Sequence, residues 1–391
     1  MRVVIESAKI LDVAIPFIRP MGWASSASRD RAGCVLVLSG GGHLGFAEAP
    51  TFASPIYDEQ FVGQTHGALG LFLAAIFAAG TSHRSGAIEI SIQEASGVLK
   101  GFKGNTSAKA AIEVAMLDLF GRQRGLKAGE TLASYARIRG HCELAARFDS
   151  LDETTSLRAQ GTSLGMISTP ELRVQELGRL ASLGYRRVKV KVDSSVELGE
   201  MRALCASSQI ELSADANGSM SDPKVVTALF EAGFCYIEQP FVPGSMRSLA
   251  RLHDLTPAKI ALDESISSLA ALEDLIAYVR FDIAVLKLSR LGGIGPLLDA
   301  VAIAEAAHVG FFIGGMYDTP ILRRLNALMV KALAPSEISD LGPDADYFGP
   351  SVSPALYRGG DGSLMILADD GISGSYIPGS ESILAVQVIK N

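Results

Sequence analysis

Three acidic residues stand at matched spacing in the middle of the chain, and each follows a run of apolar residues. They are Asp215, Glu238 and Asp263, separated by 23 and 25 residues. Each apolar run is typical of a short buried strand, so the carboxylates are expected at three strand ends. Ionised carboxylates that converge in a dry site repel one another unless a cation neutralises them. Ligation by oxygen alone predicts Mg²⁺ or Mn²⁺, with positions left for water and an anionic substrate.

The alternative interpretation is that each carboxylate caps the helix that follows it, because Asp and Glu are common near helix starts. A cap needs no partner from another strand. The matched spacing of all three residues favours the metal site.

Lysines with the same kind of placement suggest proton chemistry. Lys189 and Lys191 lie two apart on a strand and share one face, while valines occupy the other face. Lys287 follows a later apolar strand in the same way. Burying these ammonium groups requires partners, which the carboxylates supply. A neighbouring ammonium and a nearby metal also lower a lysine pKa toward the range of a general base. A purely structural ion-pair network is the alternative.

Weaker signals surround these positions. Glycines after Ser289 and Arg290 let the backbone approach a site closely, and Gly314 opens a turn that leads to Asp318, which could equally be an N-cap. The residues expected to support the site or contact substrate are Asn217, Glu264, Ser289, Arg290, Gly314, Met316, Asp318, Trp23 and Tyr57.

The elements that position these residues repeat regularly. From Lys191 through Asp215, Glu238 and Asp263 to Lys287 the steps are 24, 23, 25 and 24 residues, one strand and one helix per step. The predicted strand ends are Leu164-Gly165, Lys189-Val190-Lys191, Ala214-Asp215, Ile237-Glu238, Leu262-Asp263, Leu286-Lys287, Ile313-Gly314 and Ser339-Asp340. Such a repeat predicts an α/β fold with a TIM-type (β/α)7β barrel. The alternative is an open doubly wound sheet, but a closed barrel brings more strand ends to one point.

The regions before and after these repeats have a different pattern. Residues 1–128 combine strand-like runs with helices and predict an α+β capping domain, residues 129–368 form the catalytic barrel, and residues 369–391 return to strand character and are expected to pack back on the cap.

Composition sets further limits. The 391 residues are 48% hydrophobic and 20% charged, with a net charge of -7, which indicates a globular protein that binds neither nucleic acid nor a membrane. The most apolar stretch, near Leu69 to Ala79, is shorter than a membrane span. The four cysteines show no C-x-x-C spacing. Without a signal peptide pattern, a cytoplasmic location is expected.

The chain resembles the enolase superfamily, and within it the muconate-lactonizing-enzyme subgroup. The matching segments are Lys189-Val190-Lys191, Asp215-Ala216-Asn217, Ile237-Glu238-Gln239-Pro240, Leu262-Asp263-Glu264-Ser265 and Lys287-Leu288-Ser289-Arg290-Leu291-Gly292-Gly293. In the amino-terminal region, Gly45-Phe46-Ala47-Glu48 is similar to the family's capping domain. Among the branches, the chain is most similar to o-succinylbenzoate synthases and N-succinylamino acid racemases.

This resemblance implies Mg²⁺ bound by Asp215, Glu238 and Asp263, Lys191 as base, and Lys287 as the opposite-face acid/base or a cation beside an enolate. It implies a small carboxylate substrate and a homo-oligomer. The chain departs from the family pattern at residues 21–25, at Asp318 where a glutamate is usual, and in a long segment over residues 130–160.

Several activities remain open. The leading ones are dehydration to o-succinylbenzoate, for which one lysine suffices, and racemisation, which needs both. Muconate cycloisomerisation and dipeptide epimerisation would use the same groups. From another class, a metal-free barrel aldolase would form a Schiff base on Lys191 or Lys287, and a binding protein without catalysis is the remaining alternative.

Overall fold

The computed structural model describes the chain except residues 24–25, 152–155, 159–160, 165–168, 370 and 391. Within these described residues, seven parallel strands form a curled sheet in the order β13-β12-β11-β10-β9-β8-β7. The strands are β7 (Gly161–Leu164), β8 (Arg187–Lys191), β9 (Glu211–Asp215), β10 (Ile237–Glu238), β11 (Ile260–Leu262), β12 (Ile283–Leu286) and β13 (Gly310–Ile313). The predicted α/β class with a parallel sheet is confirmed.

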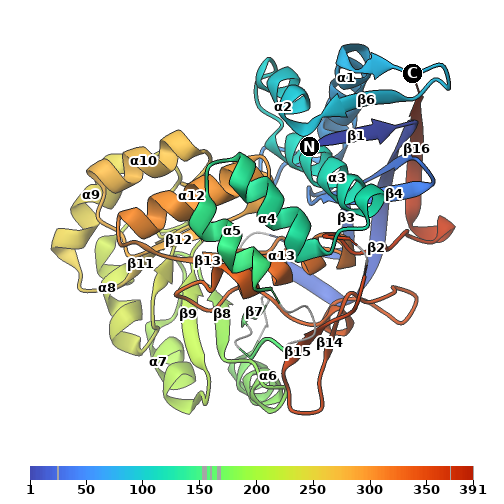
Figure 1. The fold of residues 1–391 in the computed structure, drawn as a ribbon. Coiled ribbons are helices and arrows are strands. Elements are labelled where there is room, and N and C mark those ends of the chain that lie inside the picture. Colours follow the sequence, from blue (N-terminus) through green and yellow to red (C-terminus); the bar gives the residue numbers. More distant parts are fainter. Residues whose placement is uncertain (24–25, 152–155, 159–160, 165–168, 370, 391) are drawn as a thin grey trace.

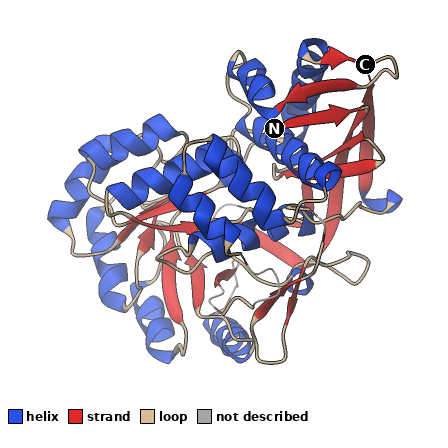
Figure 2. Ribbon diagram, in the orientation of Figure 1, coloured by secondary structure: helices blue, strands red, loops and turns tan. Residues whose placement is uncertain are grey.

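Helices cover the outer face of this sheet (Figure 2). They are α6 (Pro170–Ser182), α7 (Leu198–Ser207), α8 (Pro223–Ala232), α9 (Met246–Leu255), α10 (Leu269–Tyr278), α12 (Ile294–Ala306) and α13 (Pro320–Leu333). The short α11 (Leu288–Leu291) follows the end of β12 and packs against the other unit. Several helices begin with a hydroxyl or carboxylate cap followed by proline, as Thr169 does for α6 and Asp222 for α8. A proline at the first helical position loses no hydrogen bond, so these starts are fixed by local sequence.

The residues after α13 lie between the two edges of the sheet. On one side, Asp340 N–H donates to the Ile313 carbonyl; on the other, Gly161 N–H donates to the Ser339 carbonyl, at 3.2 and 3.0 Å. Asp340 therefore stands near a strand end, as predicted, although only an isolated parallel bridge to Gly161 forms there. The predicted strand end at Gly165 lies outside the described residues.

A second unit contains both termini (Figure 1). Its antiparallel sheets run β16-β2-β3-β4 and β1-β6-β5. The strands are β1 (Arg2–Ile5), β2 (Ser7–Trp23), β3 (Ser26–Gly40), β4 (His43–Ala49), β5 (Thr81–Ser82), β6 (Ile88–Ser91) and β16 (Ile383–Lys390). Helices α1 (Val62–Ala79), α2 (Ile92–Lys100) and α3 (Thr106–Arg124) belong to this unit. The last strand of the chain thus pairs with β2, near its start.

Further elements connect the two units. The segment over residues 130–160, noted as long, largely forms α4 (Ala128–Ile138) and α5 (Cys142–Asp149). A hairpin of β14 (Leu356–Arg358) and β15 (Leu364–Ile366) precedes the tail.

Helix α1 is long and apolar enough to cross a membrane by length and composition alone. Its residues Leu69, Phe72, Leu73 and Ile76 are fully buried and belong to the main hydrophobic core. The core helix of a soluble fold has the same composition, and this packing agrees with the predicted buried helix.

Candidate active site

The three acidic residues lie at one edge of the parallel sheet. Asp215 ends β9, Glu238 ends β10, and Asp263 follows β11 directly. In the strand register, Glu238 stands opposite Asp215. All three side chains are at most 1% exposed. The N-cap positions of the helices that follow are held by other residues, Asp222, Ser245 and Ser268, so the helix-cap interpretation of these carboxylates is wrong.

Each carboxylate is paired with a lysine. Lys191 Nζ lies 2.6 Å from Asp215 Oδ2, Lys189 Nζ lies 2.8 Å from Glu238 Oε1, and Lys287 Nζ lies 2.8 Å from Asp263 Oδ2. The strand alternation places all three ammonium groups inside the curled sheet, as the valine pattern predicted. The lysines neutralise the carboxylates where the sequence predicted a cation.

These pairs determine the charge state of Lys191. Burial acts against its charged form, but Asp215 outweighs burial, and the pKa of Lys191 is raised above its ordinary value. The lower pKa predicted from the sequence counted a neighbouring ammonium and a bound metal. Here the Asp215 carboxylate bonds directly to Lys191 and favours its charged form.

Glu238 is the most isolated of the three carboxylates. Burial raises its pKa to about 8, opposed by Lys189 and reinforced by the negative charges of Asp215 and Asp263. Its Oε2 atom is buried and has no hydrogen-bond partner among the described residues. A buried oxygen without a partner, flanked by carboxylates close enough to affect its pKa, fits a divalent cation of the Mg²⁺ type.

Asp263 is held differently. Burial acts to raise its pKa, but Arg290 and Lys287 overcome burial and keep the pKa of Asp263 well below its usual range. Arg290 forms an ion pair with Asp263 Oδ1. Over the part of the chain that the structure describes, no three His, Cys, Asp or Glu side chains form a ready-made ligand cluster. Each of the three carboxylates bonds a lysine.

The predicted supporting residues gather around the same edge. Asn217 accepts a hydrogen bond from Lys191 Nζ at 2.8 Å and donates to Glu264 Oε1 at 2.9 Å. Ser289 is buried next to Arg290 on α11. Tyr57, from the loop after β4, lies with its hydroxyl 3.1 Å from Asp263 Oδ2 and 3.0 Å from Lys287 Nζ.

The turn after β13 contains further predicted residues. A Cβ on Gly314 would lie 2.9 Å from Lys287 Cε, so a side chain there would displace the lysine. Asp318 accepts hydrogen bonds from Met316 N–H and Asn326 Nδ2, while Thr319 caps α13. The alternative that Asp318 is the helix cap is therefore wrong. Trp23 ends β2, but its side chain lies outside the described part of the structure.

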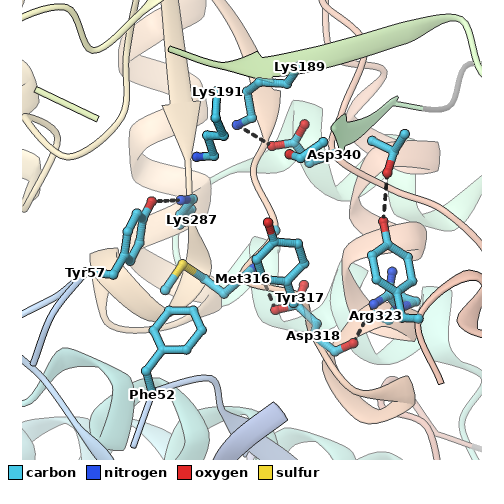
Figure 3. A pocket seen from close by; sticks show the side chains of 14 residues that line it. Phe52, Tyr57, Lys189, Lys191, Lys287, Met316, Tyr317, Asp318, Arg323 and Asp340 are labelled. Carbon is cyan, nitrogen blue, oxygen red and sulfur yellow. Dashed lines mark hydrogen bonds and ion pairs between the residues drawn. The ribbon is translucent and has the colours of Figure 1, made fainter. Parts of the chain in front are cut away.

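A pocket opens where these groups meet (Figure 3). Its lining includes the three lysines, Tyr57, Met316 and Asp318. It also contains residues that were not among the predicted site residues: Phe52, Thr162, Ser163, Gly315, Tyr317, Arg323, Asp340 and Tyr347. Of these, Asp340 stands at a predicted strand end; it bonds Lys189 Nζ at 3.0 Å and Arg187 at 2.7 Å. Gly315 and Tyr317 lie in the turn that Gly314 opens, whereas Phe52 lies outside any predicted motif.

Comparison with known proteins gives a consistent result. Residues 173–374 match the model of the enolase C-terminal domain-like family. An o-succinylbenzoate synthase of Geobacillus stearothermophilus is 27% identical, over 81% of this chain and 77% of its own. An N-succinylamino acid racemase of Thermus thermophilus is 26% identical, over 94% of each chain.

Solved structures share the fold. The muconate lactonizing enzyme of Pseudomonas fluorescens, solved with muconolactone, covers 97% of this chain and 98% of its own, with a TM-score of 0.79 and 22% identity. The family match spans more than half of the chain, and the curated relatives are enzymes. The chain is therefore an enzyme that belongs to the enolase C-terminal domain-like family.

Proposed function

We propose that this enzyme abstracts the proton next to a substrate carboxylate, with Lys191 and Lys287 on opposite faces of the reacting carbon. The observation that carries the proposal is the pairing of two buried lysines, from β8 and from the end of β12, with two of three buried carboxylates beside one pocket. Three strands separate β8 from β12 in the sheet. The lysines can therefore approach a bound carbon from two sides.

The proposed architecture is a closed (β/α)7β barrel, in which residues 337–341 take the eighth position between β13 and β7. Residues 1–128 and 369–391 form the capping domain over the barrel of residues 129–368. Hydrogen bonds from Asp340 to β13 and from Gly161 to Ser339 support closure. In such a barrel the catalytic groups lie at the carboxyl ends of the strands.

Asp215, Glu238 and Asp263 are the proposed ligands of Mg²⁺ or Mn²⁺. When bound, the cation would stabilise negative charge that develops on the substrate carboxylate. With a cation bound, these carboxylates would hold Lys191 and Lys287 less strongly as ion pairs. The charged form of Lys191 would lose its main stabilisation, which would favour the neutral form that accepts a proton.

The residues beside the pocket have separate roles in the proposed reaction. Lys191 Nζ takes the proton, and in a dehydration the same group returns it to the departing hydroxyl. In a racemisation Lys287 Nζ delivers a proton to the opposite face. Asn217 and Tyr57 hold the two ammonium groups at 2.8 and 3.0 Å.

The proposed reactions are o-succinylbenzoate synthesis and N-succinylamino acid racemisation, supported by the names of relatives at 27 and 26% identity over most of the chain. Muconate cycloisomerisation and dipeptide epimerisation use the same groups and remain alternatives. A Schiff-base aldolase needs a lysine free to attack a carbonyl, and the ion-paired Lys191 and Lys287 do not favour it. We further propose a cytoplasmic homo-oligomer.

The test is incorporation of solvent deuterium in deuterated water with Mg²⁺, over N-succinylamino acids, dipeptides and muconates, together with an assay for o-succinylbenzoate. Exchange that leaves a racemic mixture identifies a racemase, and o-succinylbenzoate identifies the synthase. Excess chelator should stop either reaction and Mg²⁺ should restore it. Activity that survives chelation and is trapped by borohydride would instead identify a Schiff-base enzyme.

A further inference from the structure

A buried ion pair lies in the second unit, which contains both termini and is called the capping unit below. The proposed reaction does not use these two residues. Arg31 on β3 is 0% exposed and Glu48 on β4 is 3% exposed. Arg31 Nη2 lies 2.9 Å from Glu48 Oε1. Replacing such a pair with apolar residues of similar volume is often neutral or stabilising, so stability alone gives no reason for burying two charges here.

The remaining donors of Arg31 reach both sides of the pocket. Arg31 Nε donates to the Tyr317 carbonyl at 2.9 Å, and Nη1 donates to the Thr51 carbonyl at 2.9 Å. The guanidinium carbon stands 5.5 Å from the ring centre of Phe52. Phe52 and Tyr317 both line the pocket (Figure 3). One side chain from the cap therefore contacts two separate loops of the pocket wall.

Glu48 holds the second of these loops. Its Oε2 accepts hydrogen bonds from Thr319 N–H at 2.8 Å and from Thr319 Oγ1 at 2.7 Å. Thr319 caps α13, and the N–H groups of the first helical turn, which have no partner within the helix, favour a negative charge there. The carboxylate thus fixes the point where the loop from Tyr317 enters the helix.

The backbone conformation of Tyr317 shows why this loop needs contacts that fix it. Its φ of +56° lies in the left-handed region, which bulky side chains rarely adopt. A conformation of this kind persists only when surrounding contacts fix it. The contacts on its carbonyl and on Thr319 both lead back to the Arg31–Glu48 pair.

We propose that the Arg31–Glu48 pair positions the pocket wall: it sets the separation between Phe52 and Tyr317 and thereby which substrate side arm the pocket accepts. The proposal rests on the proposed function in treating this pocket as the substrate site. Arg31 and Glu48 are positioning residues, because neither lines the pocket. Arginine is required because its planar group presents several donors in a fixed fork, which lysine cannot.

Hydrogen exchange measured by mass spectrometry tests the positioning directly, on the full chain and without substrate. Glu48→Gln and Arg31→Lys should each speed exchange about tenfold in peptides covering residues 50–57 and 314–319. Asp118→Asn is the matched control. It removes another buried carboxylate of the capping unit, which contacts Arg122 and the Phe46 and Ser373 backbones rather than the pocket loops. Unchanged exchange in both pocket loops for Arg31→Lys, the milder variant, would overturn the proposal.

Kinetics with N-succinylphenylalanine and N-succinylalanine provide the second measurement. The two pocket variants should raise KM several-fold while changing kcat less, and should alter the ratio of kcat/KM between the two substrates. Asp118→Asn should leave that ratio unchanged even if it lowers Tm. A proportional loss for both substrates would reduce the pair to a structural role. If wild type neither exchanges these substrates nor forms o-succinylbenzoate while the loops still loosen, both proposed reactions fail and the positioning stands.

Discussion

At the residue scale, the two lysines have different expected roles. We predict that Lys191→Ala lowers α-proton exchange by about 10²–10⁴-fold, the usual contribution of a general base. Lys287→Ala should abolish racemisation but leave part of any dehydration, because only racemisation needs a second face. Rates of exchange and of o-succinylbenzoate formation check both variants. Lys224→Ala, at an exposed lysine on α8, is the control and should retain full activity. Equal loss from both lysine variants in both reactions would contradict this division.

Glu238 carries the prediction for the metal. Added Mg²⁺ should raise the Tm of wild type, because a ligand that binds only the folded state at 100 times its Kd stabilises by about 2.7 kcal/mol. Glu238→Gln should lose most of this rise, since Glu238 provides the buried oxygen without a partner. Thermal unfolding with and without Mg²⁺ measures the effect. An equal rise in the variant would place the cation elsewhere.

At the scale of single elements, the start of α12 depends on a carboxylate from another unit. Glu113 on α3 is buried, accepts a hydrogen bond from the Tyr135 hydroxyl, and lies 3.4 Å from Gly295 N. Burial, partly offset by these hydrogen bonds, raises the pKa of Glu113 above its ordinary value of 4.5. The group therefore contributes most to stability below its unfolded pKa, and this contribution is lost as pH rises through the folded pKa.

The expected result is a pH-dependent difference between wild type and Glu113→Gln. Above pH 4.5 wild type should lose unfolding free energy relative to the variant. The loss should be about 1.4 kcal/mol for each pH unit until the folded pKa of Glu113 is passed. Urea unfolding at pH 4, 6 and 8 measures it. Any constant cost of the amide cancels in this comparison. A difference that stays constant across the range would contradict the raised pKa.

The spacing of the repeats was enough to predict the parallel strands and the edge where Asp215, Glu238 and Asp263 lie. Parallel strands joined by helices must end on the same side, so sequence intervals translate directly into position. The lysine partners could not be predicted in this way, because spacing along the chain does not say which carboxylate an ammonium will meet; Lys189 takes both Glu238 and Asp340.

Loops gave less. Asp318 and Thr319 are both suitable helix caps, and only the contacts of Asp318 with Met316 and Asn326 decide for Thr319. Phe52 and Tyr317 lie in irregular segments whose course depends on long-range contacts with Arg31. No periodicity in the sequence reports such contacts.

At the scale of the whole molecule, β16 completes the sheet of the capping unit. Its outer residues Leu384, Val386 and Val388 are 69, 55 and 53% exposed, so these three side chains add little, and its contribution comes from backbone pairing with β2 and from Ile383 and Ile389, which pack against the core. We predict that ending the chain after Ser382 lowers Tm by more than about 4 °C and causes association through the uncovered edge of β2.

Light scattering and thermal unfolding check this prediction. The control replaces Leu384, Val386 and Val388 together with threonine, which keeps the backbone pairs and the β propensity while removing apolar surface. The control should stay dispersed and keep its Tm. If the shortened chain behaves like the control, backbone pairing by β16 is not required.

The pairing of β16 with β2 also bears on how the protein is made. Residues 7–13 are synthesised long before residues 383–390, the strand that covers their edge. During translation the edge of β2 therefore stays unpaired while the parallel sheet is synthesised. Slow synthesis of the segment between them would prolong that exposure, so the yield of native enzyme should depend on translation speed before residues 383–390 and on chaperones that shield strand edges.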